Sequence, residues 1–208
     1  MMETPEGKKD FNERTGRALY WLKKGTELGF MMGEDGLIKE DFVTFRRSCP
    51  CCGASTAQSR PLWQKEGLKY VMCLYCSMVY INPVLKTEII DKTYDSASSS
   101  IAWLEVLKNQ EDLDSVKYLD VIRFFEPFLY FKEKKSSLRF LDVGASYGLF
   151  LHILKGRYPS AWCAGLELCW EALKVGHKRF PDIELLNEKL ESWAVGREGS
   201  VDVVTFLE

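Results

Sequence analysis

Four cysteines of the chain stand in two pairs whose spacing is typical of a metal site. Cys49 pairs with Cys52 and Cys73 with Cys76, and twenty residues separate the pairs, giving the pattern CxxC, x20, CxxC. Two thiolates at this spacing can wrap a tight turn and aim both sulfurs at one ion, so two such turns supply the four tetrahedral ligands that zinc accepts. Gly53 follows the first pair and favours the turn. The sequence therefore predicts a four-cysteine zinc site.

A site closed by four thiolates has no coordination position for water or substrate, so we expect the metal to stabilise the fold and not to catalyse a reaction. Iron in a rubredoxin-like site also uses two CxxC pairs, so zinc is preferred and iron is the alternative. Cys51 fits neither pair and is interpreted as a bystander. Residues 68–72 and 78–81 have the composition of strands, which predicts a zinc ribbon over residues 46–84.

A second chemical signal lies in residues 138–148, LRFLDVGASYG. The segment joins a short apolar run to the carboxylate of Asp142 and to two glycines, Gly144 and Gly148. This is the pattern of a buried strand that breaks into a ligand-binding turn and then into a helix. A helix with one apolar face follows until Pro159.

The next predicted strand, residues 161–166, ends in Glu167, nineteen residues beyond Gly148. An acid at the tip of the second strand of a parallel sheet is placed to accept both hydroxyls of a ribose. Asp142, however, disfavours a pyrophosphate, because like charges about 4 Å apart repel by about 4 kcal/mol at an effective dielectric of about 20. The turn also lacks the GxGxxG glycines of dinucleotide sites. The two acids favour a cationic nucleoside cofactor, and S-adenosylmethionine carries both an ammonium and a sulfonium.

The segments LDVGASYG, GLE and SVDVVTFLE, in this order, resemble class I S-adenosylmethionine-dependent methyltransferases. The resemblance implies that Asp142, Gly144 and Gly148 belong to the cofactor-binding turn, while Ser146 stands where a glycine is usual and puts a side chain near the ligand. It also implies that the backbone of the turn approaches the methionyl part of the cofactor and that Glu167 binds the ribose hydroxyls. The segment CSMVYINP at the second cysteine pair resembles the zinc-ribbon leader that precedes many methyltransferase domains of this class.

The remaining segments predict the elements that position these residues. Residues 1–45 form an N-terminal helical segment, with a capping box of Asp10 and Glu13 opening a helix. The expected buried face of this helix comprises Phe11, Ala18, Leu19 and Leu22. Residues 85–135 are expected to hold a linker and helices. Within them, residues 91–100 form a polar linker whose serines are mobile or start a helix, and residues 101–131 are helical. Leu113, Val116, Leu119 and Ile122 are expected to share one apolar side.

The fold class predicted is α/β, a Rossmann-like doubly wound sheet over residues 136–208, preceded by the zinc ribbon and helices. After Glu167 the pattern predicts a helix over 170–180 and strands over 183–186 and 201–207, so the sheet is incomplete, with about four strands. Seven strands are usual in the family, which predicts a chain truncated at its carboxyl end. Because the family's acceptor-side residues follow the fourth strand, the catalytic residues stay unknown. His152 and His177 are interpreted as helical surface or packing residues.

Composition excludes several classes of function. The chain has 208 residues, 46% hydrophobic residues and a formal net charge of -2, so we do not expect a general polyanion binder, and no nucleic-acid partner is indicated. There is no run of 18 apolar residues and no apolar core of a secretory signal, which predicts a cytoplasmic protein without a membrane partner. Seven cysteines in a reducing compartment are interpreted first as metal ligands.

The leading functional hypothesis is an S-adenosylmethionine-dependent methyltransferase, with a small molecule or sugar favoured as acceptor. One alternative is a non-catalytic zinc-ribbon interaction module that binds a partner. A second is a nicotinamide-dependent oxidoreductase, which Asp142 and the absent GxGxxG disfavour. The acceptor atom and the oligomeric state are left open by the sequence.

Overall fold

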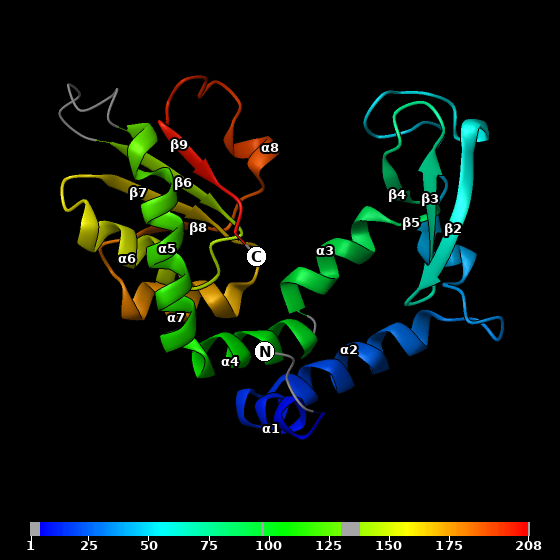
Figure 1. Ribbon diagram of the computed structural model, residues 1–208, viewed down its shortest axis with the longest axis horizontal. Coiled ribbons are helices and arrows are strands. Elements are labelled where there is room, and N and C mark those ends of the chain that lie inside the picture. Colours follow the sequence, from blue (N-terminus) through cyan, green and yellow to red (C-terminus); the bar gives the residue numbers. More distant parts are fainter. Residues whose placement is uncertain (1–4, 97, 130–137, 208) are drawn as a thin grey trace. The chain divides into compact units, whose positions relative to one another are not determined.

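The computed structural model describes residues 5–96, 98–129 and 138–207 (Figure 1). The chain divides into two compact units. Trp21–Thr93 is called the ribbon unit below, and Met1–Tyr20 together with Tyr94–Glu208 is called the Rossmann-like unit. Two helices, α2 (Arg17–Met31) and α3 (Thr87–Ser96), contain the boundaries between the units. Each unit is organised around its own sheet.

The Rossmann-like unit holds a four-stranded parallel sheet in the order β8-β7-β6-β9 (Figure 1). Its strands are β6 (Arg139–Val143), β7 (Trp162–Leu166), β8 (Glu184–Leu186) and β9 (Val203–Thr205). All three strand pairs are parallel, as connections through helices require. The predicted α/β, Rossmann-like fold is confirmed, with the first predicted strand between the second and the fourth.

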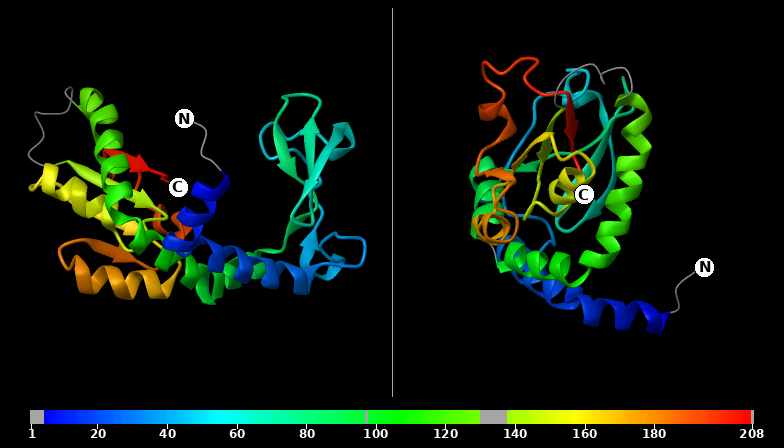
Figure 2. Two further views of the ribbon diagram at one scale, coloured as in Figure 1. Left: turned by 60° about the horizontal axis from the view of Figure 1, so that its bottom comes forward. Right: turned by 90° about the vertical axis from the view of Figure 1, so that its left-hand side faces the viewer.

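Helices cover both faces of this sheet (Figures 1 and 2). The helices of this unit are α1 (Pro5–Thr15), α4 (Ser98–Asn109), α5 (Glu111–Leu129), α6 (Leu149–Arg157), α7 (Trp170–Arg179) and α8 (Leu190–Trp193). Phe140 of β6 lies in a buried cluster with side chains of α5, α6 and α7, while its neighbour Leu141 lies in a second cluster with Trp193 of α8. Successive residues of a strand point to opposite faces, so the two clusters are the two sides of the sheet. None of the described helices is long and apolar enough to cross a membrane.

The helix expected to open at Asp10 is wrong in two respects. Helix α1 already begins at Pro5, so Asp10 lies inside it. Gly16, at φ +82°, then ends α1, and α2 starts as a separate helix. Residues before and after Gly16 belong to two different helices, so they cannot share one helical face. Leu19 and Leu22, which were expected to be buried, are exposed as a result.

The helical pattern over residues 101–131 is broken between α4 and α5, and the side expected to be apolar is mostly exposed. Ile122 is buried, but Leu113, Val116 and Leu119 are exposed. The side that faces the sheet comprises Tyr118, Ile122, Phe125 and Leu129. Helix α5 carries apolar residues all round, so periodicity alone could not choose between its two sides.

The ribbon unit contains a three-stranded antiparallel sheet and a small two-stranded one. The first comprises β2 (Ser59–Lys65), β3 (Leu68–Cys73) and β4 (Val79–Ile81), and the second β1 (Val43–Thr44) and β5 (Val84–Leu85). Two single turns, η1 (Glu40–Phe42) and η2 (Thr56–Gln58), precede β1 and β2. Strand β2 was not expected because it contains Pro61, which sits at a register shift on an outer strand, where proline is tolerated. Residues 91–96, expected to be linker, continue α3, and α4 starts at Ser98.

Candidate functional site

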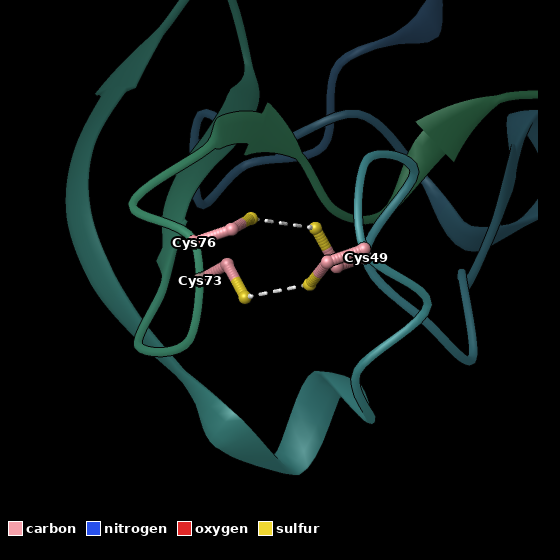
Figure 3. A group of neighbouring side chains, drawn as sticks. Cys49, Cys73 and Cys76 are labelled. Atoms are coloured by element: carbon pink, nitrogen blue, oxygen red, sulfur yellow. Dashed lines mark hydrogen bonds between the residues drawn. The ribbon is translucent and has the colours of Figure 1, made fainter.

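The four predicted metal ligands come together between two loops of the ribbon unit (Figure 3). The Sγ atoms of Cys49, Cys52, Cys73 and Cys76 all lie within 4.8 Å of one another. The shortest separations are 3.7 Å between Cys49 and Cys76 and 3.7 Å between Cys52 and Cys73. Cys51 is exposed and lies outside this set, as its position in the sequence suggested.

The sulfur geometry fits a tetrahedral ion. Four ligands at a Zn–S distance of about 2.3 Å place their sulfurs about 3.8 Å apart, which is close to the two shortest separations. The cluster could therefore hold zinc with only a small contraction of its wider pairs. A tetrahedral iron site would need the same arrangement, so the choice of zinc over iron rests on the commoner use of zinc in such sites.

The two cysteine loops have equivalent backbone geometry. Cys49 N–H donates to Ala54 O at 2.8 Å, and Cys73 N–H donates to Met78 O at 2.9 Å. The residue after each pair, Gly53 or Ser77, has a positive φ, +74° and +61° respectively.

Hydrogen bonds from the loop backbones also act on the thiols. The hydrogen bond from the backbone N–H of Cys52 is the main cause that lowers the pKa of the Cys49 thiol to about 7. The backbone N–H of Cys76 likewise lowers the pKa of the Cys73 thiol. Backbone N–H groups also act to lower the pKa of Cys52 and Cys76, but neighbouring thiols and burial raise it overall, to about 12 for Cys76. The loop backbones thus favour the thiolate, the form that binds a metal, at Cys49 and Cys73.

The second set of predicted residues gathers at the carboxyl edge of the parallel sheet. The turn after β6 is held against the end of β7, since the N–H groups of Gly144 and Ala145 both donate to Leu166 O, at 2.9 and 3.0 Å. Asp142 and Glu167 stand at the ends of these two strands. Ligands bind at this edge in open α/β sheets, so the structure places all five predicted residues where a cofactor would be expected.

Glu167 is oriented by three backbone donors. Its Oε1 accepts from Leu168 N at 2.7 Å and from Cys169 N at 2.8 Å, and its Oε2 accepts from Ser146 N at 2.8 Å. A carboxylate offers about four acceptor positions, so about one position at Oε2 stays available to a ligand hydroxyl. The same bonds tie the carboxylate to the glycine turn and fix its direction.

Asp142, which the resemblance assigned to the cofactor-binding turn, has a buried carboxylate. Its side chain is only 2% exposed, and Thr205 Oγ1 of β9 donates to its Oδ1 at 2.6 Å. Burial raises the pKa of Asp142 to about 7, against the Thr205 hydrogen bond, and the charge of Glu167 raises it further. A buried Asp142 could act on a ligand at this edge through its charge and through the turn above it, not through an exposed carboxylate.

The two glycines of the turn are required for different structural reasons. Both have positive φ, +80° at Gly144 and +86° at Gly148. A Cβ at Gly144 would meet open space, which leaves the backbone there accessible to a ligand. A Cβ at Gly148 would instead approach Leu185 to 3.3 Å, so that glycine serves packing at the start of α6. Ser146 occupies the left-handed region at φ +50°, which explains why a glycine is usual there.

Sequence reasoning missed several residues of this edge. Thr205 binds Asp142, and Asn187 Nδ2 donates to the carbonyl oxygens of Glu167 and Leu168, both at 3.0 Å. Asn187 directly follows the strand predicted over 183–186, so its position was a usable signal, whereas Thr205 ends the observed β9 but lies inside the strand predicted over 201–207.

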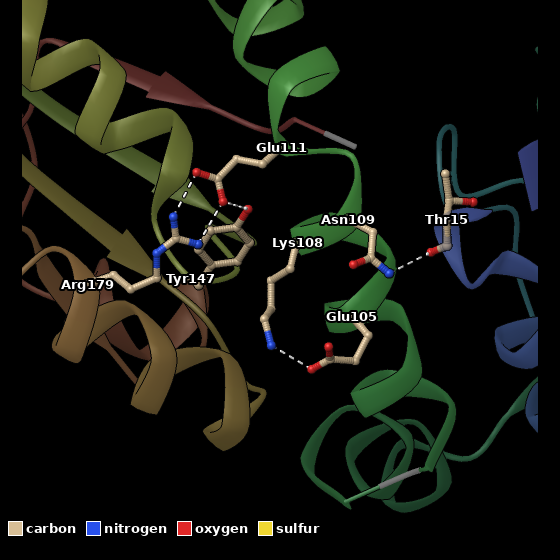
Figure 4. Close-up of polar contacts among 7 residues, drawn as sticks. All are labelled: Thr15, Glu105, Lys108, Asn109, Glu111, Tyr147 and Arg179. Atoms are coloured by element: carbon tan, nitrogen blue, oxygen red, sulfur yellow. Dashed lines mark hydrogen bonds and ion pairs between the residues drawn. The ribbon is translucent and has the colours of Figure 1, made fainter.

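A polar clamp, defined here as Glu111, Tyr147 and Arg179, holds the turn from the side (Figure 4). Both carboxylate oxygens of Glu111 accept from Arg179, at 2.7 and 2.8 Å, and Tyr147 Oη–H donates to Glu111 Oε2 at 3.3 Å. Tyr147 is a member of the glycine turn and is almost fully buried. The clamp therefore connects the first turn of α5 and the last turn of α7 to the turn that would bind the cofactor.

Both histidines make packing or hydrogen-bond contacts inside the Rossmann-like unit. His152 of α6 stacks on Phe180 with ring centroids 4.2 Å apart. His177 of α7 shares a hydrogen bond with Leu185 O through Nε2, at 3.0 Å. Both are engaged in packing, which agrees with their interpretation from sequence.

No protein-family model and no curated protein matches the chain. Solved structures do match part of it. The plantazolicin methyltransferase BpumL in complex with SAH is 15% identical, with 56% of this chain and 44% of that chain covered and a TM-score of 0.43. CalS10, an amino pentose methyltransferase from Micromonospora echinaspora, solved with bound SAM, is 25% identical, with 46% and 35% covered and a TM-score of 0.30. The chain thus spans less than half the length of these structures. Because both TM-scores are below 0.5, functional inference for this chain rests on its own sheet and site.

Proposed function

We propose that the Rossmann-like unit binds S-adenosylmethionine and belongs to a methyltransferase, with a small molecule or sugar as the favoured acceptor. The site residues proposed are Asp142, Gly144, Ser146, Gly148 and Glu167. The cysteine cluster is proposed as a structural zinc site that folds the ribbon unit. The acceptor class follows only from the resemblance of the sequence to zinc-ribbon-bearing methyltransferases.

One observation carries the cofactor proposal: two carboxylates lie beside an accessible glycine turn at the carboxyl edge of the sheet. Their charges act on each other, since Glu167 raises the pKa of Asp142. A pyrophosphate would add negative charge to this edge, whereas the ammonium and sulfonium of S-adenosylmethionine would offset it. This charge balance supports the methyltransferase hypothesis over the nicotinamide-dependent oxidoreductase.

The roles of the residues follow from their contacts. Glu167, fixed by three backbone N–H groups, would accept a hydrogen bond from a ribose hydroxyl at its remaining acceptor position. The open side of Gly144 would let the cofactor approach the backbone of the turn. S-adenosylmethionine, when bound, supplies an activated methyl group. The protein's main task in such a transfer is to hold acceptor and methyl group in line.

Calorimetry of the full chain with S-adenosylhomocysteine, S-adenosylmethionine and NAD⁺ tests the cofactor proposal. We expect the two adenosyl ligands to bind and NAD⁺ to bind more weakly. Glu167→Ala should weaken adenosyl binding about tenfold or more, because charge-assisted hydrogen bonds are each worth roughly 1.5–3 kcal/mol.

A matched control is Glu184→Ala. Glu184 is the first residue of β8 and accepts from Trp162 Nε1 at 3.0 Å, at the other end of the strands. The loss of the Glu184 carboxylate should leave cofactor affinity unchanged.

Unchanged cofactor affinity in Glu167→Ala would refute the ribose role of Glu167. Binding of NAD⁺ but not of the adenosyl ligands would refute the cofactor class, and cofactor binding without methyl transfer to any acceptor would favour the interaction module.

Elemental analysis of protein purified without added metal tests the zinc proposal. We expect one ion per chain. Cys76→Ser should abolish it, while Cys51→Ser should not change the metal content. A protein that folds with no bound metal would overturn the proposal, and iron in place of zinc would select the alternative ion.

A further inference from the structure

The central segment of the ribbon unit, residues 43–86, concentrates positive charge that the composition of the whole chain conceals. Residues 43–86 contain six basic side chains against one acidic side chain, a formal charge of +5 in a chain whose total is -2. The basic side chains are Arg46, Arg47, Arg60, Lys65, Lys69 and Lys86. Four thiolates around one divalent cation contribute -2, which leaves the segment at about +3 with its metal bound. The rest of the chain is acidic.

These charges are available to a partner. Arg46, Arg47 and Arg60 are all exposed, and none of them forms an ion pair within the described part of the chain. The single acidic residue, Glu66, is already held by Lys24 at 3.1 Å. The positive charge is local to this segment, because the ribbon unit as a whole has ten basic and eight acidic side chains, a formal charge of +2.

One face of the three-stranded sheet combines this charge with stacked aromatic rings. The strands β2, β3 and β4 that form the sheet are labelled in Figure 1. Trp63 of β2 stacks on Tyr70 of β3 with ring centroids 5.3 Å apart and planes at 18°, and Trp63 is still 52% exposed. Arg60 and Lys65 flank Trp63 along β2. Their partners across the ladder, Met72 and Leu68, lie two residues on either side of Tyr70, so all of these residues share one face.

The opposite face of the sheet is the buried one. Val71, Cys73 and Tyr80 lie there in a cluster with Cys49, beside the four sulfurs. The cysteine cluster thus lies on one side of the sheet and the aromatic face on the other. Beyond the outer strand β4, Arg46 N–H donates to Asn82 Oδ1 at 2.9 Å, which brings a further basic residue next to the sheet.

We infer that this face of the ribbon unit binds a single-stranded nucleic acid, with a base stacked on Trp63 and phosphates near Arg60 and Lys65. Single strands bind proteins through aromatic rings that accept any base and through basic groups that track the backbone. A single strand is favoured over an anionic membrane or an acidic protein because a base can stack on the flat, exposed ring while phosphates meet the basic residues on either side of it. The inference is independent of the cofactor proposal, because every residue involved lies in the ribbon unit.

Fluorescence anisotropy of a labelled twelve-nucleotide oligo(U) with the metal-loaded full chain tests the inference. We expect binding that weakens about 20- to 50-fold between 50 and 200 mM salt, as three or four phosphate contacts to a single strand imply. Trp63→Ala should lower affinity about fivefold or more. Arg60→Gln should reduce the slope of log affinity against log salt by about 0.7.

Trp21→Ala is the matched control, since Trp21 is 50% exposed in the same unit but lies on α2. It should leave oligo(U) affinity unchanged. Unchanged metal content and thermal midpoint in Trp63→Ala would show that its loss of affinity is not unfolding. The inference is overturned if oligo(U) does not bind at 100 µM protein, or if Trp63→Ala binds as wild type. It is also overturned if heparin or phosphatidylserine vesicles bind more tightly than oligo(U), which would indicate charge recognition without bases.

Discussion

Ser77 takes the place in the second cysteine loop that Gly53 has in the first. It has φ +61°, whereas Gly53 at the same place in the first loop has φ +74°. A left-handed conformation costs a non-glycine residue roughly 1–2 kcal/mol, partly offset by the greater chain entropy of glycine when unfolded. We therefore expect Ser77→Gly to raise the free energy of unfolding by about 1 kcal/mol or less, measured from urea midpoints with metal bound.

The reverse substitution supplies the control. No atom lies within 4 Å of a Cβ added at Gly53, so Gly53→Ser should be destabilising through φ alone, by a similar amount. If Ser77→Gly destabilised the chain, the equivalence of the two loops would be wrong.

Asp142 makes stability depend on pH in an unusual direction. Burial raises its pKa to about 7 in the folded chain, whereas an unfolded aspartate titrates near 3.9. Between these values the folded state binds more protons, so the contribution of Asp142 to the free energy of unfolding falls as pH rises from about 4 to about 7. Asp142→Asn removes this penalty while keeping an acceptor for Thr205.

We expect Asp142→Asn to be as stable as wild type at pH 4 and more stable at pH 8, by up to the order of 4 kcal/mol. Urea unfolding of both proteins across this range measures the difference. Parallel stability curves would contradict the raised pKa. A variant that is more stable yet binds the adenosyl ligands less well would show that the carboxylate is retained for its charge.

Residues of the site could be predicted where their signal is local. The cysteine pairs and the turn from Asp142 to Gly148 are short patterns, and Glu167 follows from the length of one strand–helix–strand unit. Thr205 lies 63 residues from the Asp142 that it binds, and Tyr147 lies 36 residues from Glu111. Such pairings depend on sheet order and helix packing, which no local pattern encodes.

At the scale of elements, two chemically similar clamps tie helices to opposite ends of the Rossmann-like unit. Glu111 binds Arg179 and Tyr147 beside the glycine turn. Glu126 binds Arg157 Nε at 2.6 Å and Tyr158 Oη at 3.1 Å, both at the carboxyl end of α6. Only the first clamp includes a residue of the proposed cofactor turn.

We expect Glu111→Gln to destabilise the chain by about 1 kcal/mol, since the pair is partly exposed and screened, and to weaken S-adenosylhomocysteine binding. Glu126→Gln should destabilise it by no more than this and leave binding unchanged. Urea midpoints and calorimetry separate the two effects. Equal changes in ligand affinity in both variants would mean that the first clamp does not position the turn.

Elements with a clear period and clear ends were predicted, and those without them were not. The strands of the parallel sheet are apolar runs bounded by turns, and all four were found. Strand β2 was missed because Pro61 and several polar residues interrupt it. The buried side of α5 was chosen wrongly because its apolar residues surround the helix, so only the sheet beneath it decides which of them are covered.

At the scale of the whole molecule, the Rossmann-like unit exposes two apolar features of a kind that usually find partners. Strand β9 pairs with β6 alone among the described strands, and it exposes Val204, with Phe206 exposed just beyond it. The outward side of α5 exposes Phe124 and Phe128, whose rings lie 6.2 Å apart. An open strand edge and a bare apolar helix side both promote association between copies of a chain.

We therefore expect the chain to self-associate. The open edge of β9 would be enough to predict this, and the exposed side of α5 adds to it. Sedimentation velocity between 5 and 200 µM should show an average mass that rises with concentration. Phe124→Glu with Phe128→Glu should shift the rise to higher concentration, because burying the added charges in an apolar contact is costly. The matched control is Phe30→Glu in the ribbon unit, since Phe30 and Phe124 are both 76% exposed. A chain that stays monomeric at 200 µM would show that neither the β9 edge nor the side of α5 is adhesive, and an equal effect of Phe30→Glu would assign the association to the ribbon unit.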